Sequence, residues 1–317
     1  MSSYRSPLLD RPGAVEADAP DGGVAAHYGA ISPEQLKLLA GTAFVDLSHR
    51  EVVSISGADR LTWLHSLTTQ FLEGLAPGVP TEVLILSPQG RVEFAFTGVD
   101  DGTTFWAHTE PGHGAGLATW LDRMRFMMRV EVADVTHEWA VIGLPGLTYK
   151  LLPRAELAAA PDTHGDPVGL WAWDALRIEA GRVRLGFDTD EKTIPNEVGW
   201  ISTDDHVGAV HMDKGCYRGQ ETVARVHNLG RPPRRLVLLH LDGSSEHLPA
   251  LHSPLILDGK AVGFIGSVAR HHELGTIGLG LVKRNVDSSA TLIADGVPAA
   301  QEVLVDPDIG LHVRPVL

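Results

Sequence analysis

The sequence has a single cysteine, Cys216, among its 317 residues. One thiol excludes an intrachain disulfide, and it excludes a zinc or iron–sulfur site built from several cysteines of one chain. A single cysteine fits a reducing compartment, so we expect a cytoplasmic protein. The sequence also lacks an apolar run of about 18 residues, and its start lacks the apolar core of a signal peptide. We therefore expect no membrane partner.

Positive charge is also scarce, since the formal net charge is −14. Binding to nucleic acid needs a cationic face that displaces counterions, so we expect no nucleic-acid partner. The same acidity disfavours docking on anionic membranes. A length of 317 residues suggests two domains, one of which is larger than the other.

The first part of the chain is divided by composition and periodicity. Residues 1–23 are rich in Pro, Gly, Ala and Asp, which predicts a flexible tail. Residues 52–56 read as a strand, and a helix follows with Leu61, Leu64 and Leu67 on one face. A hairpin is expected around residues 100–102, Asp-Asp-Gly, and another helix over 170–179.

Three of the five methionines lie between residues 124 and 128. Leu117, Leu121, Met124 and Met128 recur at helical spacing. A soft metal site is one interpretation of these methionines. Core packing is the interpretation that we prefer, because Met fills irregular gaps and no other soft ligand lies nearby in the sequence.

The character of the sequence changes beyond Arg235. Short β-rich runs alternate with turn signals at Asp242-Gly243, Asp258-Gly259 and Asp295-Gly296. This spacing predicts a small antiparallel barrel over residues 235–317, with Pro232-Pro233 at the boundary. Residues 24–231 would form the other domain, and the fold class would be α+β.

The segment KGCYRGQE, residues 214–221, carries the clearest chemistry. Lys214 and Arg218 lie two residues to either side of Cys216, and nearby cations favour a reactive thiolate. The alternative is a buried structural cysteine that behaves as a small hydrophobe.

Basic residues also gather around this segment. From Lys214 to Arg235 the chain has six basic residues and one acid, Glu221, a net charge of +5. Arg225 and Arg231 are among the six, and arginines bind carboxylates bidentately. The segment is therefore either a solvated basic loop or a patch that attracts an anionic ligand such as the glutamate tail of a folate. A nucleotide phosphate would be the competing ligand, but no phosphate-loop or dinucleotide-binding glycine motif is present.

KGCYRGQE resembles the signature of the YgfZ family, folate-binding proteins that support iron–sulfur enzymes and are related to the aminomethyltransferase (T-protein) of the glycine cleavage system. The resemblance extends over nearly the whole chain from about residue 24, through GADRLTWLHSLTTQ (57–70), LSPQGRV (86–92), LRIEAGRVRLGFD (176–188), IPNEVGW (194–200) and VARVHNLGRPPRRL (223–236). It implies a T-protein-like folate-binding body with a C-terminal barrel. It also implies tetrahydrofolate, or a one-carbon derivative, as the cofactor.

The resemblance also implies roles for single residues. Pro195-Asn196-Glu197 is similar to the Pro-x-Glu motif of the T-protein. The resemblance implies that the Glu197 carboxylate accepts hydrogen bonds from the pterin ring. Tyr217, Gln220, Arg225, Arg231 and Glu93 are the other residues expected near the folate, and Arg177 and Asp188 are expected to hold the surrounding loop. Cys216 would be the functional thiol, assisted by Lys214 and Arg218. The partners implied are iron–sulfur client enzymes, of the radical-SAM type.

The sequence departs from the T-protein at the aspartate that the transferase requires. Here the stretch reads Gln89-Gly90-Arg91-Val92-Glu93, so Glu93 is a displaced substitute. We therefore expect a maintenance protein without catalytic turnover of its own. A folate-dependent one-carbon transferase, with Glu93 as general acid or base, is the first alternative. A folate-binding interaction module with a structural cysteine is the second.

A metal site is not expected. His206, His211 and Cys216 recur at intervals of five, near Asp204 and Asp205. This spacing matches neither a helical histidine pair nor a zinc knuckle.

Overall fold

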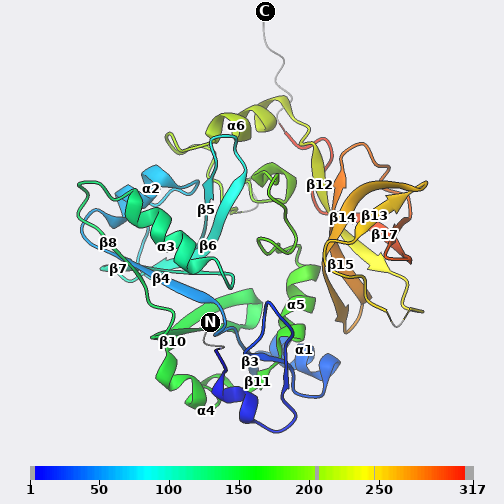
Figure 1. Ribbon diagram of the computed structural model, residues 1–317, viewed down its shortest axis with the longest axis horizontal. Coiled ribbons are helices and arrows are strands. Elements are labelled where there is room, and N and C mark those ends of the chain that lie inside the picture. The colour runs from blue at the N-terminus through cyan, green and yellow to red at the C-terminus, as the bar shows by residue number, and fades with distance from the viewer. Residues whose placement is uncertain (1–3, 204–206, 246, 311–317) are drawn as a thin grey trace, which may run out of the picture.

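A computed structural model describes residues 4–203, 207–245 and 247–310. Its strands form three lobes that surround the centre of the molecule (Figure 1). Two lobes are open sheets and the third is a closed barrel. In the part of the chain described, no helix combines the length and the apolar character that crossing a membrane requires.

The first lobe is a five-stranded antiparallel sheet in the order β5-β6-β7-β4-β8. The predicted hairpin is present, because Asp101 Oδ1 accepts hydrogen bonds from the backbone N–H groups of Thr103 and Thr104 and so closes the turn. A buried apolar cluster lies between this sheet and helices α2 and α3. The elements are β4 (Glu51–Ser56), α2 (Arg60–Leu67), β5 (Thr81–Leu86), β6 (Val92–Asp100), β7 (Thr104–Thr109), α3 (Gly114–Arg123) and β8 (Glu131–Asp134).

The second lobe is a four-stranded sheet in the order β10-β9-β3-β11, in which only β11 pairs in parallel. Helix α5 covers it and also packs against the barrel strand β14, so this helix joins two lobes. The elements are α1 (Ile31–Leu39), β3 (Ala43–Asp46), β9 (Trp139–Leu144), β10 (Thr148–Pro153), α4 (Pro161–His164), β11 (Asp166–Val168) and α5 (Leu170–Glu179). The helix predicted over 170–179 is therefore confirmed.

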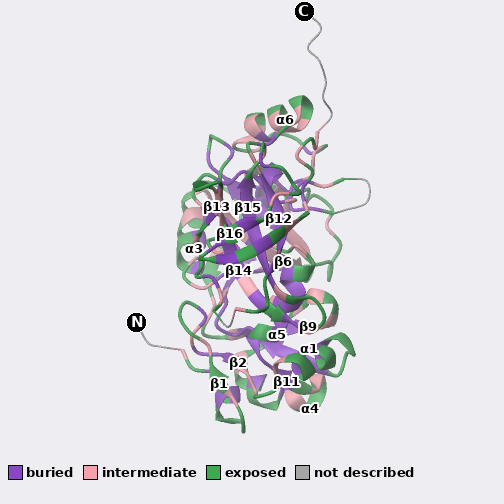
Figure 2. Ribbon diagram, turned by 90° about the vertical axis from the view of Figure 1, so that its right-hand side faces the viewer, coloured by how far each residue is buried: buried purple, intermediate pink, exposed green. Residues whose placement is uncertain are grey.

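The third lobe is a closed antiparallel barrel in the order β12-β15-β14-β13-β16-β17, as predicted. Asp258-Gly259 and Asp295-Gly296 have positive φ at both residues, which two-residue hairpin turns require. Asp242-Gly243 instead begins a longer connection to β13. In Figure 2 the largely buried barrel strands lie below helix α6 (Gln220–Leu229), which is mostly exposed or half-buried. The barrel strands are β12 (Arg234–Leu241), β13 (Pro254–Leu257), β14 (Lys260–His271), β15 (Gly275–Lys283), β16 (Leu292–Ala294) and β17 (Val297–Val303).

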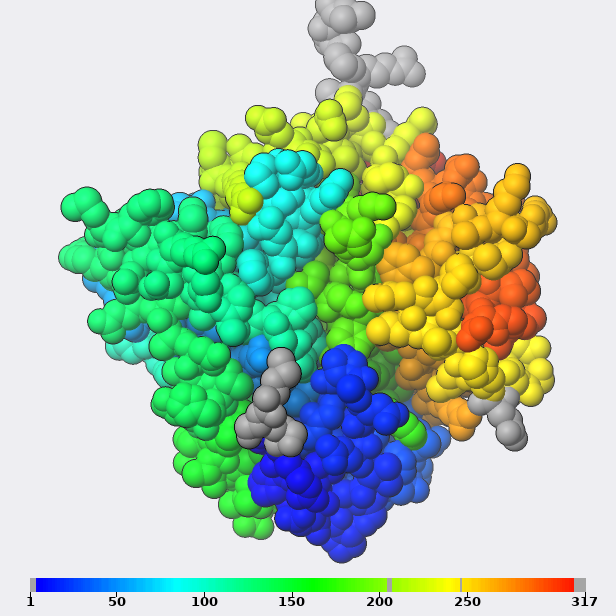
Figure 3. Space-filling model, in the orientation of Figure 1, coloured from blue at the N-terminus to red at the C-terminus, as the bar shows by residue number. Residues whose placement is uncertain are grey.

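The prediction of a flexible tail over residues 1–23 is wrong for the described residues 4–23. Leu8 and Leu9 are buried, and a 3₁₀ turn over Pro7–Asp10 is capped by the Ser6 hydroxyl. The strands β1 (Val15–Glu16) and β2 (Ala25–His27) pair beside this turn. Figure 3 shows these dark-blue residues lying against the body of the molecule. Composition misled here because the acids and hydroxyls of this segment find buried partners, which composition alone does not reveal.

The methionine segment also differs from its prediction. Helix α3 ends at Arg123, and Phe126 has a φ of 45°, so the helical spacing does not continue to residue 128. Met124 packs against the core of the first lobe, but Met127 is 97% exposed and Phe126 is 84% exposed. Core packing was therefore the wrong interpretation for Met127.

Candidate functional site

A cavity of about 610 Å³ lies where the three lobes meet. Strands β5, β6 and β7 supply one wall, and residues of the second lobe and the barrel supply the others. The connecting segments around residues 180–185, 198–203 and 207–209 complete it. The polar side chains among its lining residues are Arg50, Glu82, Thr97, His108, Thr109, Glu110, Tyr149, Trp173, Arg177, Arg182, Arg184, Trp200 and Thr203.

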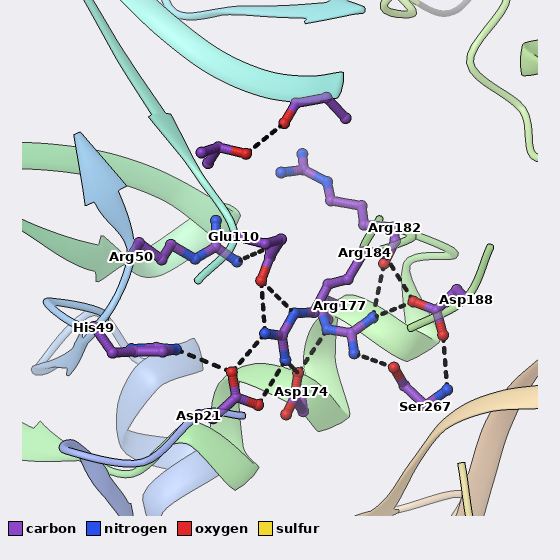
Figure 4. Close-up of polar contacts among 12 residues, drawn as sticks. Asp21, His49, Arg50, Glu110, Asp174, Arg177, Arg182, Arg184, Asp188 and Ser267 are labelled. Carbon is purple, nitrogen blue, oxygen red and sulfur yellow. Dashed lines mark hydrogen bonds and ion pairs between the residues drawn. The ribbon is translucent and has the colours of Figure 1, made fainter. Parts of the chain in front are cut away.

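A buried ion network forms part of this lining (Figure 4). Arg184 lies at its centre, with Nη2 at 2.6 Å from both Asp21 Oδ1 and Glu110 Oε2. Glu110 also forms an ion pair with Arg50, whose Nη2 lies 2.9 Å from Oε1, and His49 Nε2 lies 3.1 Å from Asp21 Oδ1. The network therefore joins the N-terminal segment to β7 and to the segment that follows α5.

Each charge in this network stabilises its neighbours. Burial favours protonation of Glu110, but Arg184 and Arg50 outweigh it and lower the pKa of Glu110 to about 2. Asp21 behaves alike, since bonds from His49 and Arg184 hold its pKa well below the ordinary value despite burial. Both carboxylates are therefore ionised at neutral pH and cannot act there as proton donors.

A second cluster ties the network to the barrel. Arg177 donates to Asp174 Oδ1 at 2.6 Å, to Asp188 Oδ2 at 3.0 Å and to Ser267 Oγ at 2.5 Å. Asp188 Oδ1 also accepts from the backbone N–H of Ser267 at 2.7 Å. Arg177 and Asp188 thus hold α5 and the following loop against β14.

Arg182 differs from the other arginines of the cavity. It is exposed, and its Nη1 donates to the carbonyl of Leu147 at 2.7 Å. In Figure 4 its guanidinium points away from the ion network. Among the described residues it has no acidic partner, so it is free to bind an anion.

The Cys216 loop lies next to the turn at Gly90. Gly219 has a φ of 82°, and a Cβ there would approach the carbonyl oxygen of Ser87 to 2.3 Å. A Cβ on Gly90 would in turn meet the Cβ of Thr222 at 2.7 Å. The two turns are far apart in the sequence but touch each other, and this close contact requires glycine at both positions.

Lys214 anchors the other side of this loop. Its buried ammonium donates to the carbonyl oxygens of His65, in the last turn of α2, and of Thr68 and Gln70, which follow that helix. Burial lowers the pKa of Lys214 to about 8, which still leaves the ammonium protonated at neutral pH. The ammonium is thus occupied in fixing the loop, which differs from the role of activating the thiol that the sequence suggested.

The remaining residues of the loop also have local partners. Arg218 Nη1 lies 3.1 Å from Glu93 Oε2, and the Gln220 side chain accepts from the backbone N–H of Tyr217 at 3.1 Å. Burial raises the pKa of Tyr217 to about 12. Cys216 itself is free and exposed. The structure thus brings Glu93 to the loop that carries Cys216. Neither Glu93 nor Cys216 lines the cavity.

Glu197 is placed differently from the expectation. It is 1% exposed, and its carboxylate accepts from Arg234 Nε at 2.9 Å, from Arg234 Nη2 at 2.8 Å and from the Ile194 backbone N–H at 3.1 Å. Its neighbours Val198 and Gly199 line the cavity, but Glu197 does not. The carboxylate that should read the pterin is therefore occupied by an arginine.

The basic segment is not a free patch. Arg231 pairs with Asp308 at 3.6 Å, Arg234 with Asp190 at 2.7 Å, and Arg235 donates to backbone carbonyls at the end of β15. Arg225 is exposed on α6, with no bonding partner in the described parts of the chain. Of the six basic side chains, three thus pair with acids (Arg218, Arg231 and Arg234) and two bond backbone carbonyls (Lys214 and Arg235).

Several cavity residues escaped the sequence analysis. Arg182 and Arg184 lie within a quoted motif, His108 lies in the predicted hairpin and Trp173 in the predicted helix over 170–179, whereas Glu82 lies in β5, which was not predicted. What identifies all five is their convergence on one cavity, which requires the pairing of distant segments. No group of three or more His, Cys, Asp or Glu residues is placed to hold a metal ion in the described ranges, and His206, Asp204 and Asp205 lie outside them.

We compared the sequence and the fold with those of known proteins. No family model matches the sequence. The fold matches that of the glycine cleavage system aminomethyltransferase T from Bartonella henselae, with a TM-score of 0.75 over 96% of this chain and 97% of that one, at 17% identity. The aminomethyltransferase of Rippkaea orientalis is 24% identical over 329 residues, which is 84% of this chain and 85% of that protein. The chain is related to the aminomethyltransferases.

A chloroplastic protein of Arabidopsis thaliana, At1g60990, whose name assigns it provisionally to the transferases, is also similar. It is 25% identical over 308 residues, covering 81% of this chain and 68% of that protein. The predicted fold class, an α+β T-protein-like body with a C-terminal barrel, is thus confirmed. The narrower likeness to the YgfZ family rests on the motifs quoted above.

Proposed function

We propose that this chain binds a reduced folate in the central cavity and that its exposed thiol serves the maintenance of iron–sulfur enzymes. The observation that carries the folate half is the cavity itself. Its volume is within the range of small-molecule sites, and three of its lining residues, Arg50, His108 and Trp173, carry buried nitrogen atoms that lack partners in the described protein. An interior of this kind is completed by a polar ligand. The relationship to aminomethyltransferases makes tetrahydrofolate, or a one-carbon derivative, the first candidate.

The arginine that would hold the tail of this ligand is the one in the cavity without an acidic partner among the described residues. Arg182 offers a guanidinium for the carboxylates of the glutamate tail. Arg225 and Arg231, which the sequence suggested for this role, do not line the cavity.

Isothermal calorimetry tests this half of the proposal. Tetrahydrofolate should bind to the wild-type protein, and Arg182→Ala should weaken it by about tenfold, the effect of losing one charge-assisted bond. A tail-less tetrahydropterin should bind both proteins alike. Arg225→Ala is the matched control, since it removes an exposed arginine outside the cavity. Wild-type protein that binds no reduced folate would refute the proposal.

The thiol half rests on the way in which the loop presents Cys216. The loop is fixed by Lys214 on one side and by the contact of Gly219 with Gly90 on the other, whereas the thiol is exposed. A thiol held outward on an anchored loop suits contact with another protein or with a cluster in transit. The clients would be iron–sulfur enzymes of the radical-SAM type, in the cytoplasm.

One-carbon transfer remains a second candidate, and one observation favours it. A transferase needs a proton-transfer group beside the folate. Glu93 pairs with Arg218 outside the cavity, and Glu110 is held ionised by two arginines. Glu82 lines the cavity, and its carboxylate has no bonding partner among the described residues, so it could take that role. Turnover of a one-carbon folate by the purified protein, lost in Glu82→Gln, would establish this function.

A further inference from the structure

The loop between α3 and β8 presents neighbouring large apolar side chains to solvent. It lies at the left-hand edge of the molecule in Figure 1, on the side opposite the barrel. Phe126 is 84% exposed, Met127 is 97% exposed, and Met128 is also exposed. Single exposed apolar residues are ordinary, but three consecutive ones form a patch, and such patches mark surfaces that contact a partner. Aromatic residues and methionine are also enriched in protein–protein interfaces.

The backbone at the tip of this loop has a conformation that a large side chain disfavours. Phe126 has a φ of 45°, in the left-handed region where bulky residues are uncommon. Because its ring is exposed, burial within the chain does not offset this strain. Strained residues cluster at sites that bind or react, so the geometry favours a contact outside the chain.

Both ends of the loop are anchored, which fixes the position of its tip. Trp63 Nε1 donates to the carbonyl oxygen of Met124 at 3.1 Å. At the other end, Asp59 accepts from the backbone N–H of Arg129 at 2.9 Å and from its guanidinium at 2.5 and 3.0 Å. Gly57 permits this approach, because a Cβ there would come within 2.2 Å of the carbonyl oxygen of Arg129. A tip held in this way loses little conformational entropy when it binds a partner.

The charge around the tip differs from that of the rest of the protein. Residues 123–130 contain three arginines and no acid, in a chain whose net charge is −14. Arg123 is exposed and has no partner among the described residues, whereas Arg125 and Arg129 each lie near one acid outside this segment. The surface around the tip therefore favours a negatively charged partner.

A groove beside the tip fits the same kind of partner. It has a volume of about 630 Å³ and is lined by residues 56–58 and 125–131. Arg125 and Arg129 are among the lining residues, so carboxylates of a partner can bond their guanidinium groups there. An acidic protein surface with an apolar pocket satisfies both the tip and the groove. An anionic lipid surface also combines these properties, but the net charge of −14 disfavours its approach.

One short helix holds both this loop and the loop that carries Cys216. Trp63 of α2 anchors Met124, and the carbonyl oxygen of His65, two residues further along α2, accepts from Lys214. Helix α2 has eight residues and is therefore about 12 Å long. A protein interface of standard size takes about 20–30 residues from each side, so one partner can contact the apolar tip and the thiol together.

We propose that residues 123–130 form the docking site for the iron–sulfur client enzyme. Phe126 and Met127 insert into an apolar pocket of the client, and acidic residues around that pocket bond the arginines. The docked client then lies beside Cys216. This inference rests on the proposed function and deepens it, because it names the surface that selects the client.

Binding of a purified radical-SAM enzyme tests the inference, with a client whose activity the wild-type protein restores in cells. Calorimetry should show that Phe126→Ser/Met127→Ser binds this client at least about tenfold more weakly than the wild-type protein does. The double variant should keep the wild-type Tm and tetrahydrofolate affinity, because both side chains are exposed and neither lines the cavity. Leu36→Ser/Leu39→Ser is the matched control, since it removes an exposed apolar pair from α1 and should bind the client as the wild-type protein does.

Arg123→Glu tests the charge of the partner, and it replaces the double variant should that variant fail to fold. Client binding should weaken at least about threefold, and the affinity of the wild-type protein should fall as salt rises. Lys260→Glu, at an exposed position of the barrel strand β14, makes the same change in net charge and should leave the affinity unchanged.

The outcomes separate this inference from the proposed function. If the wild-type protein restores no iron–sulfur enzyme, the proposed function fails and the inference fails with it. If it restores a client, the function stands. The inference alone is then overturned if that client does not bind the wild-type protein, binds the double variant equally well, or is unaffected by Arg123→Glu.

Two other occupants of the tip are also distinguishable. Sedimentation with phosphatidylglycerol vesicles that the double variant abolishes would assign the tip to a lipid surface. A dimer in analytical ultracentrifugation that the double variant dissociates would assign it to a second copy of this chain. Either result would overturn the inference.

Discussion

Glu197 and Arg234 form a two-point ion pair, with Arg234 Nε 2.9 Å from Oε1 and Nη2 2.8 Å from Oε2. The pair joins the turn Pro195–Glu197 to the first residue of the barrel strand β12. Arg234 also binds Asp190 at 2.7 Å, so one guanidinium holds two acids of the connecting segment. The side chain of Glu197 is 1% exposed, and its partner is therefore needed to neutralise it.

This geometry predicts that Glu197→Ala acts on stability. Removing Glu197 takes away the buried one of the two acids that neutralise Arg234 and leaves Asp190 as its remaining partner, which costs about 3 kcal/mol. Urea unfolding should show that loss, whereas the affinity of the protein that remains folded for tetrahydrofolate should change less than threefold. Asp190→Ala, which removes the more exposed partner of Arg234, should cost less. If Glu197→Ala instead lost folate binding while its stability was unchanged, Glu197 would be a ligand-binding residue and the prediction would be wrong.

The free energy of unfolding should decrease as the pH is lowered, and His108 should account for part of this decrease. Its folded pKa of about 3 is below the ordinary 6.5, so between these values the unfolded chain binds a proton that the folded chain does not. Stability is therefore lost as pH falls through this window. Glu110, with a pKa lowered from 4.5 to about 2, adds a further loss at lower pH.

Urea unfolding at pH 7.5 and 5.5 measures this linkage. Between these pH values, His108→Gln should lose about 1.4 kcal/mol less stability than the wild-type protein, the value of one proton over one pH unit. His137→Gln, at an exposed position, is the control. An identical loss in wild type and His108→Gln would show that the imidazole titrates in the folded protein as it does in the unfolded chain.

Local patterns in the sequence were sufficient to predict much of the fold. Asp258-Gly259 and Asp295-Gly296 marked hairpins because positive φ at both residues is a local requirement. The helix over 170–179 and the strand at 52–56 follow from the spacing of apolar residues within one element. These features depend on neighbours in the sequence, which the sequence displays directly.

The candidate site was less predictable because its chemistry depends on distant partners. Lys214 is two residues from Cys216, yet its ammonium binds carbonyls near residue 68. Composition predicted that Asp21 belongs to a flexible tail, but in the structure it pairs with Arg184, 163 positions away. Residue type and spacing cannot state which acid meets which base, so a role inferred from either alone is incomplete.

The exposed side chain of Met127 should contribute little to the stability of the protein. Met127 is 97% exposed, so Met127→Ser should change the free energy of unfolding by no more than about 0.5 kcal/mol. Leu121, on the buried face of α3, is the contrast, and Leu121→Ala should cost about 2–5 kcal/mol. Chemical denaturation measures both variants. A large cost at Met127 would mean that this loop packs against the protein in solution.

Cys216→Ser should separate folding and ligand binding from the cellular role of the protein. The thiol is exposed, and the residue is not part of the cavity lining, so the variant should match the wild-type Tm and tetrahydrofolate affinity. Serine is nearly isosteric, but it lacks the nucleophilic and metal-binding sulfur.

Expression in cells that lack the wild-type protein provides the decisive measurement. Under oxidative stress, Cys216→Ser should fail to restore the activity of iron–sulfur client enzymes, although it binds folate. Lys214→Met is the informative companion, because it keeps the sulfur but leaves three carbonyls of the loop anchor without their donor. It should restore activity only in part. Full rescue by Cys216→Ser would make the thiol dispensable, and loss of folate binding in that variant would assign the cysteine to the ligand site, since nothing else about the fold should have changed.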